Sequence, residues 1–130
     1  MVEEVLRYES PVHSQARTTT RAVELHGEVI PEGTKVLLLF ASAGRDERAF
    51  PDPDRFDVTR TIERHLSFGH GIHHCLGAAL ARLEARVAFE ELFTTLPDWR
   101  ITSDLDALDY VPSYQIRGPV SLHVEFTPVA

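Results

Sequence analysis

The sequence predicts an α+β fold that is mainly α-helical, and three stretches carry this prediction. Residues 22–39 combine β-branched and aliphatic residues with two glycine turns, which predicts a hairpin followed by a buried strand. Residues 2–8 read as the last turns of a helix. The strongest signal is an apolar stripe at helical spacing late in the chain, formed by Leu76, Leu80, Leu83 and Val87.

The length and composition of the chain predict one globular domain with a core. Of its 130 residues, 43% are hydrophobic and 25% are charged, which is unlike a disordered segment. The formal net charge of -7 gives no support to nucleic-acid binding. The longest apolar run, residues 36–43, is far shorter than the roughly 20 residues of a membrane-spanning helix. We therefore expect a cytoplasmic protein, and a single cysteine, Cys75, suits that reducing compartment.

The N-terminal helix is expected to stop at Ser10 and Pro11, because the residue before a proline disfavours helical geometry. Within this helix, Glu4 and Arg7 are three residues apart, so both lie on one face and can pair. Taken alone, such a pair is most often an ordinary surface ion pair. The chain is then expected to run extended over residues 11–17.

The β-rich stretch is expected to turn at His26 and Gly27, and glycine again marks the turn that leads into an apolar strand over residues 35–40. A short helix over residues 41–48 follows in this prediction. Near the C-terminus, residues 112–128 alternate in polarity, which predicts a final strand.

The long helix is expected to run from Cys75 to Pro97, and its alanines allow close packing. We expect its apolar stripe to face the core. Arg82, Arg86 and Glu90 lie on the opposite side, where we expect a solvated ladder of charges.

The loop before this helix, residues 68–77, reads FGHGIHHCLG and contains the cysteine. A metal-ligating thiolate is favoured beside a helix N-terminus, where backbone N–H groups and the positive end of the dipole point toward sulfur. The surrounding glycines let a flat cofactor approach the main chain. Two alternatives stay open at this point: a buried, inert thiol, and a zinc site built from Cys75, His70, His73 and His74.

This loop resembles the haem-thiolate loop of the cytochromes P-450, whose pattern is F-G-x-G-x-H-x-C-x-G. Every fixed position of the pattern is filled, by Phe68, Gly69, Gly71, His73, Cys75 and Gly77. The resemblance implies that Cys75 is the axial ligand of the iron in heme b (iron protoporphyrin IX) and that His73 meets a haem propionate. It also implies that Phe68 packs over the proximal sulfur.

Other stretches resemble further motifs of the same family. Glu4 and Arg7 resemble the E-x-x-R motif of its K helix. Residues 50–56, FPDPDRF, resemble its meander, which implies that Arg55 joins the pair as a third partner. Arg17 matches the arginine placed on a haem propionate, a pairing for which the planar guanidinium is well suited.

The resemblance also places a substrate pocket. Val12, His13 and Ser14 would face the substrate, and residues 111–115 would form the tip of a hairpin that reaches into the pocket. His13 is given no chemical role, because a lone histidine is more often solvated than catalytic.

The resemblance covers the chain from the E-x-x-R motif onward and identifies residues 1–130 as a single partial domain, the C-terminal part of a soluble, bacterial-type cytochrome P-450. It implies a K helix, β-hairpins, the meander, the cysteine loop, a long L helix and C-terminal strands. The N-terminal part of the fold, with the helix that delivers protons to dioxygen, is expected to be absent. No catalytic acid or base is therefore assigned in this chain.

The implied function is that of a monooxygenase, which inserts one oxygen atom from dioxygen into a small hydrophobic organic substrate. The chain alone is expected to be inactive, and the alternative is a non-catalytic haem-binding or interaction remnant. The expected partner is a ferredoxin or similar electron donor at the proximal face. Positive charge would guide its docking there, with Arg60, Arg64, Arg82 and Arg86 outnumbering Glu63 and Glu84.

Overall fold

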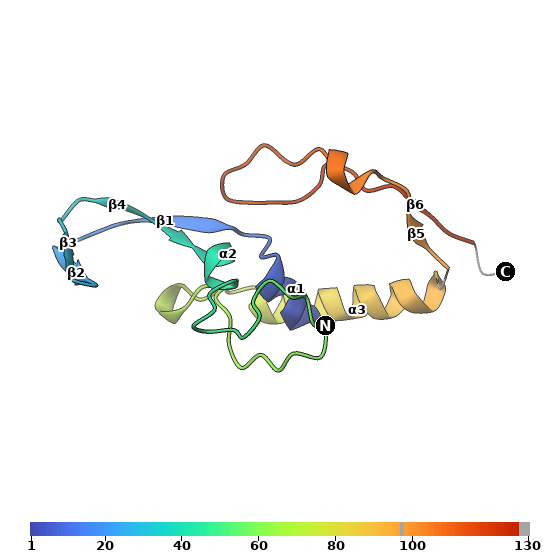
Figure 1. Cartoon of the computed structure of the whole chain (residues 1–130), viewed down its shortest axis with the longest axis horizontal. Helices are drawn as coiled ribbons and strands as arrows, with labels where there is room; N and C mark the ends of the chain where they lie inside the picture. The colour runs from blue at the N-terminus through green and yellow to red at the C-terminus, as the bar shows by residue number, and fades with distance from the viewer. Residues whose placement is uncertain (97, 128–130) are drawn as a thin grey trace.

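The computed structural model describes residues 1–96 and 98–127 (Figure 1). Its helices are α1 (Val2–Tyr8), α2 (Phe40–Ala43) and α3 (Ala78–Thr95), with short 3-10 turns η1 (Gly71–His73) and η2 (Leu105–Ala107). Its strands are β1 (Ser14–Thr18), β2 (Val23–Leu25), β3 (Glu28–Ile30), β4 (Lys35–Leu39), β5 (Arg100–Ile101) and β6 (Val124–Glu125). The architecture is α+β, as predicted, with α3 as its longest element.

The predicted hairpin is formed by β2 and β3, and it projects at the left end of the molecule in Figure 1. The strands that flank it in sequence, β1 and β4, form a second antiparallel pair. His26 and Gly27 close the hairpin of β2 and β3 with φ angles of 52° and 85°. A two-residue turn of this kind needs positive φ at both positions, which glycine adopts without steric cost. The prediction of a buried strand is wrong for β4, because most of its residues are exposed.

The short helix after β4 ends earlier than predicted. α2 covers Phe40–Ala43, whereas the sequence predicted a helix over residues 41–48. The Asp46 carboxylate accepts the backbone N–H of Arg48 at 2.9 Å, which is a local turn that competes with a helix.

The C-terminal segment returns to lie beside the extended stretch that follows α1. Val12 pairs with Ile116 in an isolated bridge, and the backbone N–H of His13 donates to the carbonyl of Gln115 at 2.7 Å. β5 and β6 pair further along the segment. Only part of the strand predicted for residues 112–128 is therefore regular, and Pro128 lies outside the described residues.

α3 begins later than predicted. The Ala78 N–H donates to the Cys75 carbonyl at 3.2 Å, so residues 75–77 form a turn and the helix starts at Ala78. It ends at Thr95, and Pro97, predicted to stop it, lies outside the described residues. Neither α3 nor another helix in the described part of the chain is long and apolar enough to cross a membrane.

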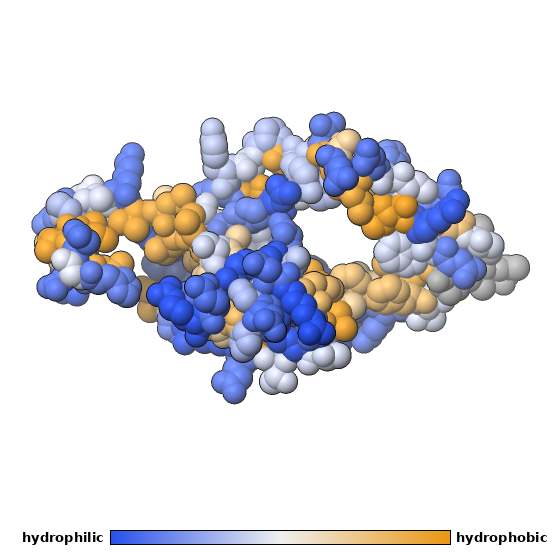
Figure 2. All heavy atoms as spheres, in the orientation of Figure 1, coloured by the Kyte–Doolittle hydropathy of each residue, from blue (hydrophilic) through white to orange (hydrophobic). Residues whose placement is uncertain are grey.

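Apolar burial within the chain is small. Among the described residues, Ala78 is the buried apolar side chain, whereas the largest fully buried side chains are Arg7, Glu4 and Ser10. The prediction that the apolar stripe of α3 is core is wrong for this chain, since Leu80 is 57% exposed and Leu76 fully exposed. Little of the described chain lies against this stripe, and in the first half of α3 the less exposed positions are Ala78, Ala81, Arg82 and Ala85 instead. Figure 2 shows apolar side chains at the surface over α3.

Candidate functional site

The cysteine loop, residues 68–77, is closed by its own backbone. The Cys75 N–H donates to the Phe68 carbonyl at 2.9 Å, and the His74 N–H donates to the Gly71 carbonyl at 3.0 Å. Gly69 and Gly71 have φ angles of 69° and 70°, in the left-handed region that favours glycine. The two glycines therefore let the chain fold back so that Cys75 sits at the end of a tight loop.

The sulfur of Cys75 lies on an open surface. Cys75 is a free, exposed cysteine, and α3 begins three residues later. A Cβ added at Gly77 would lie 3.9 Å from the sulfur, and one at Gly71 would meet nothing within 4 Å. The two glycines thus leave open space beside the exposed Cys75, as a flat ligand requires. The alternative of a buried, inert thiol does not fit this exposure.

The histidines of the loop do not gather around the cysteine. In residues 1–96 and 98–127, no group of three or more His, Cys, Asp or Glu residues could hold a metal ion, so the zinc alternative has no geometric support. His73 and His70 are exposed. His74 instead packs edge-on against the Phe68 ring, with centroids 6.4 Å apart.

The E-x-x-R pair is the most deeply buried polar contact of the chain. The Arg7 side chain is 0% exposed and Glu4 is 1% exposed. Arg7 donates from Nε to Glu4 Oε2 at 2.7 Å and from Nη2 to Glu4 Oε1 at 2.8 Å. Its remaining N–H groups reach the carbonyl oxygens of Gly44, Pro53 and Arg55. One guanidinium thereby joins α1, the end of α2 and the loop that follows.

The second guanidinium at Glu4, after that of Arg7, belongs to Arg60, and the expectation that the Arg55 side chain is the third partner of the cluster is wrong in the structure. Arg60 Nε lies 3.4 Å from Glu4 Oε1, and its side chain is 12% exposed. Arg55 contributes its carbonyl oxygen alone, while its side chain is 72% exposed and lies 3.8 Å from Asp57. The turn at residues 52–55 directs the Arg55 side chain outward.

These donors lower the pKa of the Glu4 carboxyl to about 2, mainly through the hydrogen bond from Arg7. The pKa is depressed on folding, so this pair stabilises the protein fully above its ordinary value of 4.5 and less as the pH falls toward about 2. We expect acid to remove about 3 kcal/mol of unfolding free energy in this window.

Urea unfolding at a series of pH values checks this expectation. High salt screens exposed ion pairs, such as Asp46 with Arg48, much more than the buried pair of Glu4 and Arg7. The acid-dependent loss of stability should therefore persist at high salt. Asp46→Asn should keep the acid-dependent loss, and Glu4→Gln should flatten it. An equally steep loss in Glu4→Gln would contradict the assignment.

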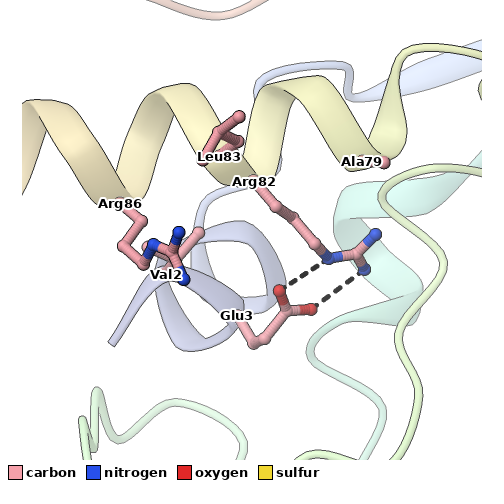
Figure 3. Close-up of a pocket in the computed structure, with 6 residues that line it drawn as sticks. All are labelled: Val2, Glu3, Ala79, Arg82, Leu83 and Arg86. Atoms are coloured by element: carbon pink, nitrogen blue, oxygen red, sulfur yellow. Dashed lines mark hydrogen bonds and ion pairs between the residues drawn. The ribbon is translucent and has the colours of Figure 1, made fainter.

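A second carboxylate on α1 also binds an arginine, as Figure 3 shows. Glu3 accepts from Arg82 Nε at 2.7 Å and from Arg82 Nη2 at 3.0 Å. The expectation that Arg82 belongs to a solvated ladder is therefore wrong, whereas Arg86 and Glu90 form an exposed pair at 3.9 Å. Glu3 and Arg82 line an open cleft of about 340 Å³ between α1 and α3. Sequence analysis missed Glu3 because its partner is 79 residues away.

The remaining predicted residues lie along β1 and the stretch before it. Arg17 is exposed, and its Nη1 donates to the Ala16 carbonyl at 2.8 Å. Ser14 is 3% exposed, and its hydroxyl donates to the Tyr114 carbonyl at 3.2 Å. Val12 and His13 are half-buried beside the same C-terminal segment. The structure thus joins residues 12–14 to residues 114–116.

Known proteins that resemble this chain in sequence and structure come from one family. The sequence profile of the family described as Cytochrome P450 matches residues 1–96. Cytochrome P450 130 of Mycobacterium tuberculosis is 54% identical over 127 residues, 97% of this chain and 31% of that protein. The monooxygenase PikC of Streptomyces venezuelae is 47% identical over 126 residues, 96% of this chain and 30% of that protein.

Solved structures agree with the sequence relatives. The tirandamycin C-bound P450 monooxygenase TamI superimposes with a TM-score of 0.93 at 46% identity, covering 97% of this chain and 32% of that one. The chain spans about a third of the length of the relatives it matches. Both sequence and fold lead to one conclusion: this chain belongs to the cytochrome P450 family.

Proposed function

We propose that the chain is the haem-binding part of a cytochrome P450 monooxygenase, with the Cys75 thiolate as the axial iron ligand. The observation that carries the proposal is an exposed, lone thiol on a glycine-rich loop directly before the long helix α3. Residues 1–130 would form one partial domain of the fold. A single reduced thiol also suits the cytoplasm, where we place the protein.

The donor set of the site suits haem. When bound, haem with a thiolate ligand supplies the chemistry that activates dioxygen. In this proposal Cys75 holds the iron, while the exposed His73 and Arg17 are available to the propionates. Phe68, whose carbonyl accepts the Cys75 N–H at 2.9 Å, would shield the sulfur. The chain itself thus binds and orients the cofactor.

A reduced carbon monoxide spectrum tests this proposal. The purified chain is titrated with haem, reduced and exposed to carbon monoxide. We expect saturable binding and the red-shifted absorption typical of a thiolate ligand. No haem binding, or a spectrum typical of a nitrogen ligand, would contradict the proposal.

We further propose that haem capture alone does not make this chain a working monooxygenase. Its support is the exposed sulfur and the small apolar burial, since an open site admits water and promotes side reactions. The haem-loaded chain, given a reductase system and a panel of hydrophobic substrates, should form no more product than free haem. Coupled turnover well above that control would count against this proposal and against the alternative, a non-catalytic haem-binding or interaction remnant.

The substrate side of the proposal is a small hydrophobic organic molecule near residues 12–14. Val12 and His13 are half-buried and remain candidates for the pocket. Ser14 is a weaker candidate, because its hydroxyl already donates to the Tyr114 carbonyl and the residue is 3% exposed. We assign the neighbouring residues 111–115 to the same pocket.

For the electron donor, we propose an acidic protein such as a ferredoxin that docks on the cysteine-loop side. Arg60 pairs with Glu4 and Arg82 with Glu3, which offsets much of their charge. The exposed Arg64, together with Arg86 in its looser 3.9 Å pair with Glu90, would steer docking. We expect Arg64→Glu to slow electron transfer at low salt, and Arg48→Glu, in the turn after α2 and outside the cysteine loop, to leave it unchanged. Rates that ignore both salt and Arg64→Glu would contradict this docking site.

A further inference from the structure

The carboxylate of Glu3 collects N–H groups from two parts of the chain that are distant in sequence. Arg82 on α3 donates to both of its oxygens, at 2.7 and 3.0 Å. His65, in the loop before Phe68, places Nε2 at 2.9 Å from Glu3 Oε2. Glu3 therefore links α1, α3 and the stretch that leads into the cysteine loop.

The surroundings of His65 define which ring nitrogen carries the proton. The backbone N–H of Ser67 points to His65 Nδ1 at 3.2 Å, so Nδ1 accepts and Nε2 donates to Glu3. The His65 side chain is 2% exposed, whereas that of Glu3 is 40% exposed, so the imidazole is the shielded partner of the contact. A buried imidazole with both nitrogens paired holds one orientation.

Both donors flank the same aromatic ring. The Arg82 guanidinium lies 4.6 Å from the Phe68 ring centroid, and the His65 ring lies 6.0 Å from it. Ser67, between His65 and Phe68, donates its hydroxyl to the Leu6 carbonyl at 2.6 Å, which ties this stretch to α1. The Phe68 carbonyl in turn accepts the Cys75 N–H at 2.9 Å.

We propose that Glu3 is a positioning residue, which acts through His65 and Arg82 to hold Phe68 and thereby the backbone of the Cys75 loop. The functional part of this inference rests on the proposed function, since a fixed loop would keep the thiol directed at a cofactor. The hydrogen bonds themselves do not depend on the cofactor. Glu3 is thus distinct in role from Glu4, which faces Arg7 and Arg60.

The side chains that hydrogen-bond to Glu3, Arg82 and His65, both donate, so this position needs a side chain with two acceptor oxygens. The three contacts from Arg82 and His65 fall on two acceptor oxygens. Glutamine has the same shape but offers one acceptor oxygen and an NH₂ group, which would oppose an N–H donor. Glu3→Gln should therefore break part of the network without removing side-chain volume.

Amide hydrogen exchange by NMR on the haem-free chain tests the network. We expect the Cys75 amide to be protected in the wild type and to exchange about tenfold faster in Glu3→Gln, as for the loss of one charged hydrogen bond. Glu84→Gln is the matched control, because Glu84 is an exposed carboxylate on α3, and it should leave the rate unchanged.

Two variants of His65 separate positioning from simple loss of stability. His65→Gln can still donate to Glu3 and should retain part of the protection, whereas His65→Phe keeps a ring beside Phe68 but donates nothing and should behave like Glu3→Gln. Urea midpoints and the exchange of α3 amides report global stability alongside. Nitrogen-15 shifts of His65 should show the Nε2–H tautomer in the wild type.

The outcomes separate this inference from the proposed function. An unprotected Cys75 amide in the wild type, or equal rates in Glu3→Gln and Glu84→Gln, would overturn the network. If the chain gives a thiolate-type carbon monoxide spectrum but the Cys75 amide exchanges at equal rates in Glu3→Gln and Glu84→Gln, the network is overturned and the haem proposal stands. Faster exchange in Glu3→Gln in a chain that takes up no haem would support the network and contradict the haem proposal.

Discussion

Arg7→Ala is expected to lower the free energy of unfolding by roughly 3 to 5 kcal/mol, because it removes the closest charged partner of the buried Glu4 carboxylate and leaves only the longer contact from Arg60, at 3.4 Å, and the Asp57 N–H. In the intact pair the Glu4 side chain is 1% exposed, so its charge is satisfied by donors of the protein. The carbonyl oxygens of Gly44 and Pro53, which accept from Arg7 at 2.6 and 2.8 Å, would also lose their donor. Urea unfolding followed by circular dichroism measures the change.

Two control variants make this test specific. Arg7→Lys keeps the charge but not the planar fork, so it should recover only part of the loss. Arg48→Ala removes a surface pair with Asp46, in which the Arg48 side chain is 80% exposed, and should change stability far less than Arg7→Ala. Similar losses for Arg7→Ala and Arg48→Ala would mean that the buried pair does not hold α1 in place.

Cys75→Ala is expected to abolish the thiolate-type carbon monoxide spectrum completely, because the chain has no other thiol. The side chain is exposed, so the substitution should change the urea midpoint little. His74→Ala is the matched control at the neighbouring position, and it should keep the thiolate spectrum. An unchanged spectrum in Cys75→Ala would show that another group binds the iron.

Local motifs in the sequence predicted the parts of the site that are close along the chain. Glu4 and Arg7 are one helical turn apart, so their pairing follows from helix geometry. The loop around Cys75 is also local, since its glycines and its closing hydrogen bonds lie within ten residues of sequence. These features need no knowledge of tertiary structure.

The features that sequence analysis missed depend on loop paths. Arg60 reaches Glu4 because the irregular stretch after Phe50 folds back under α1, and no periodicity encodes that path. Glu3, His65 and Arg82 meet across three separate elements, so their spacing in sequence carries no signal.

The burial of α3 was mispredicted for a different reason. Its apolar stripe shows that one face is suited to packing, but the pattern does not say what covers that face. In this chain Leu83 is 47% exposed and Val87 is 45% exposed. The chain spans about a third of the length of the relatives it matches.

Iron X-ray absorption of the haem-loaded chain is the most direct test of whether the Cys75 sulfur binds haem iron. We expect one sulfur neighbour of the iron in the wild type and only nitrogen or oxygen neighbours in Cys75→Ala. Wild-type spectra that contain no sulfur neighbour, with a histidine nitrogen in the axial position instead, would contradict this ligation.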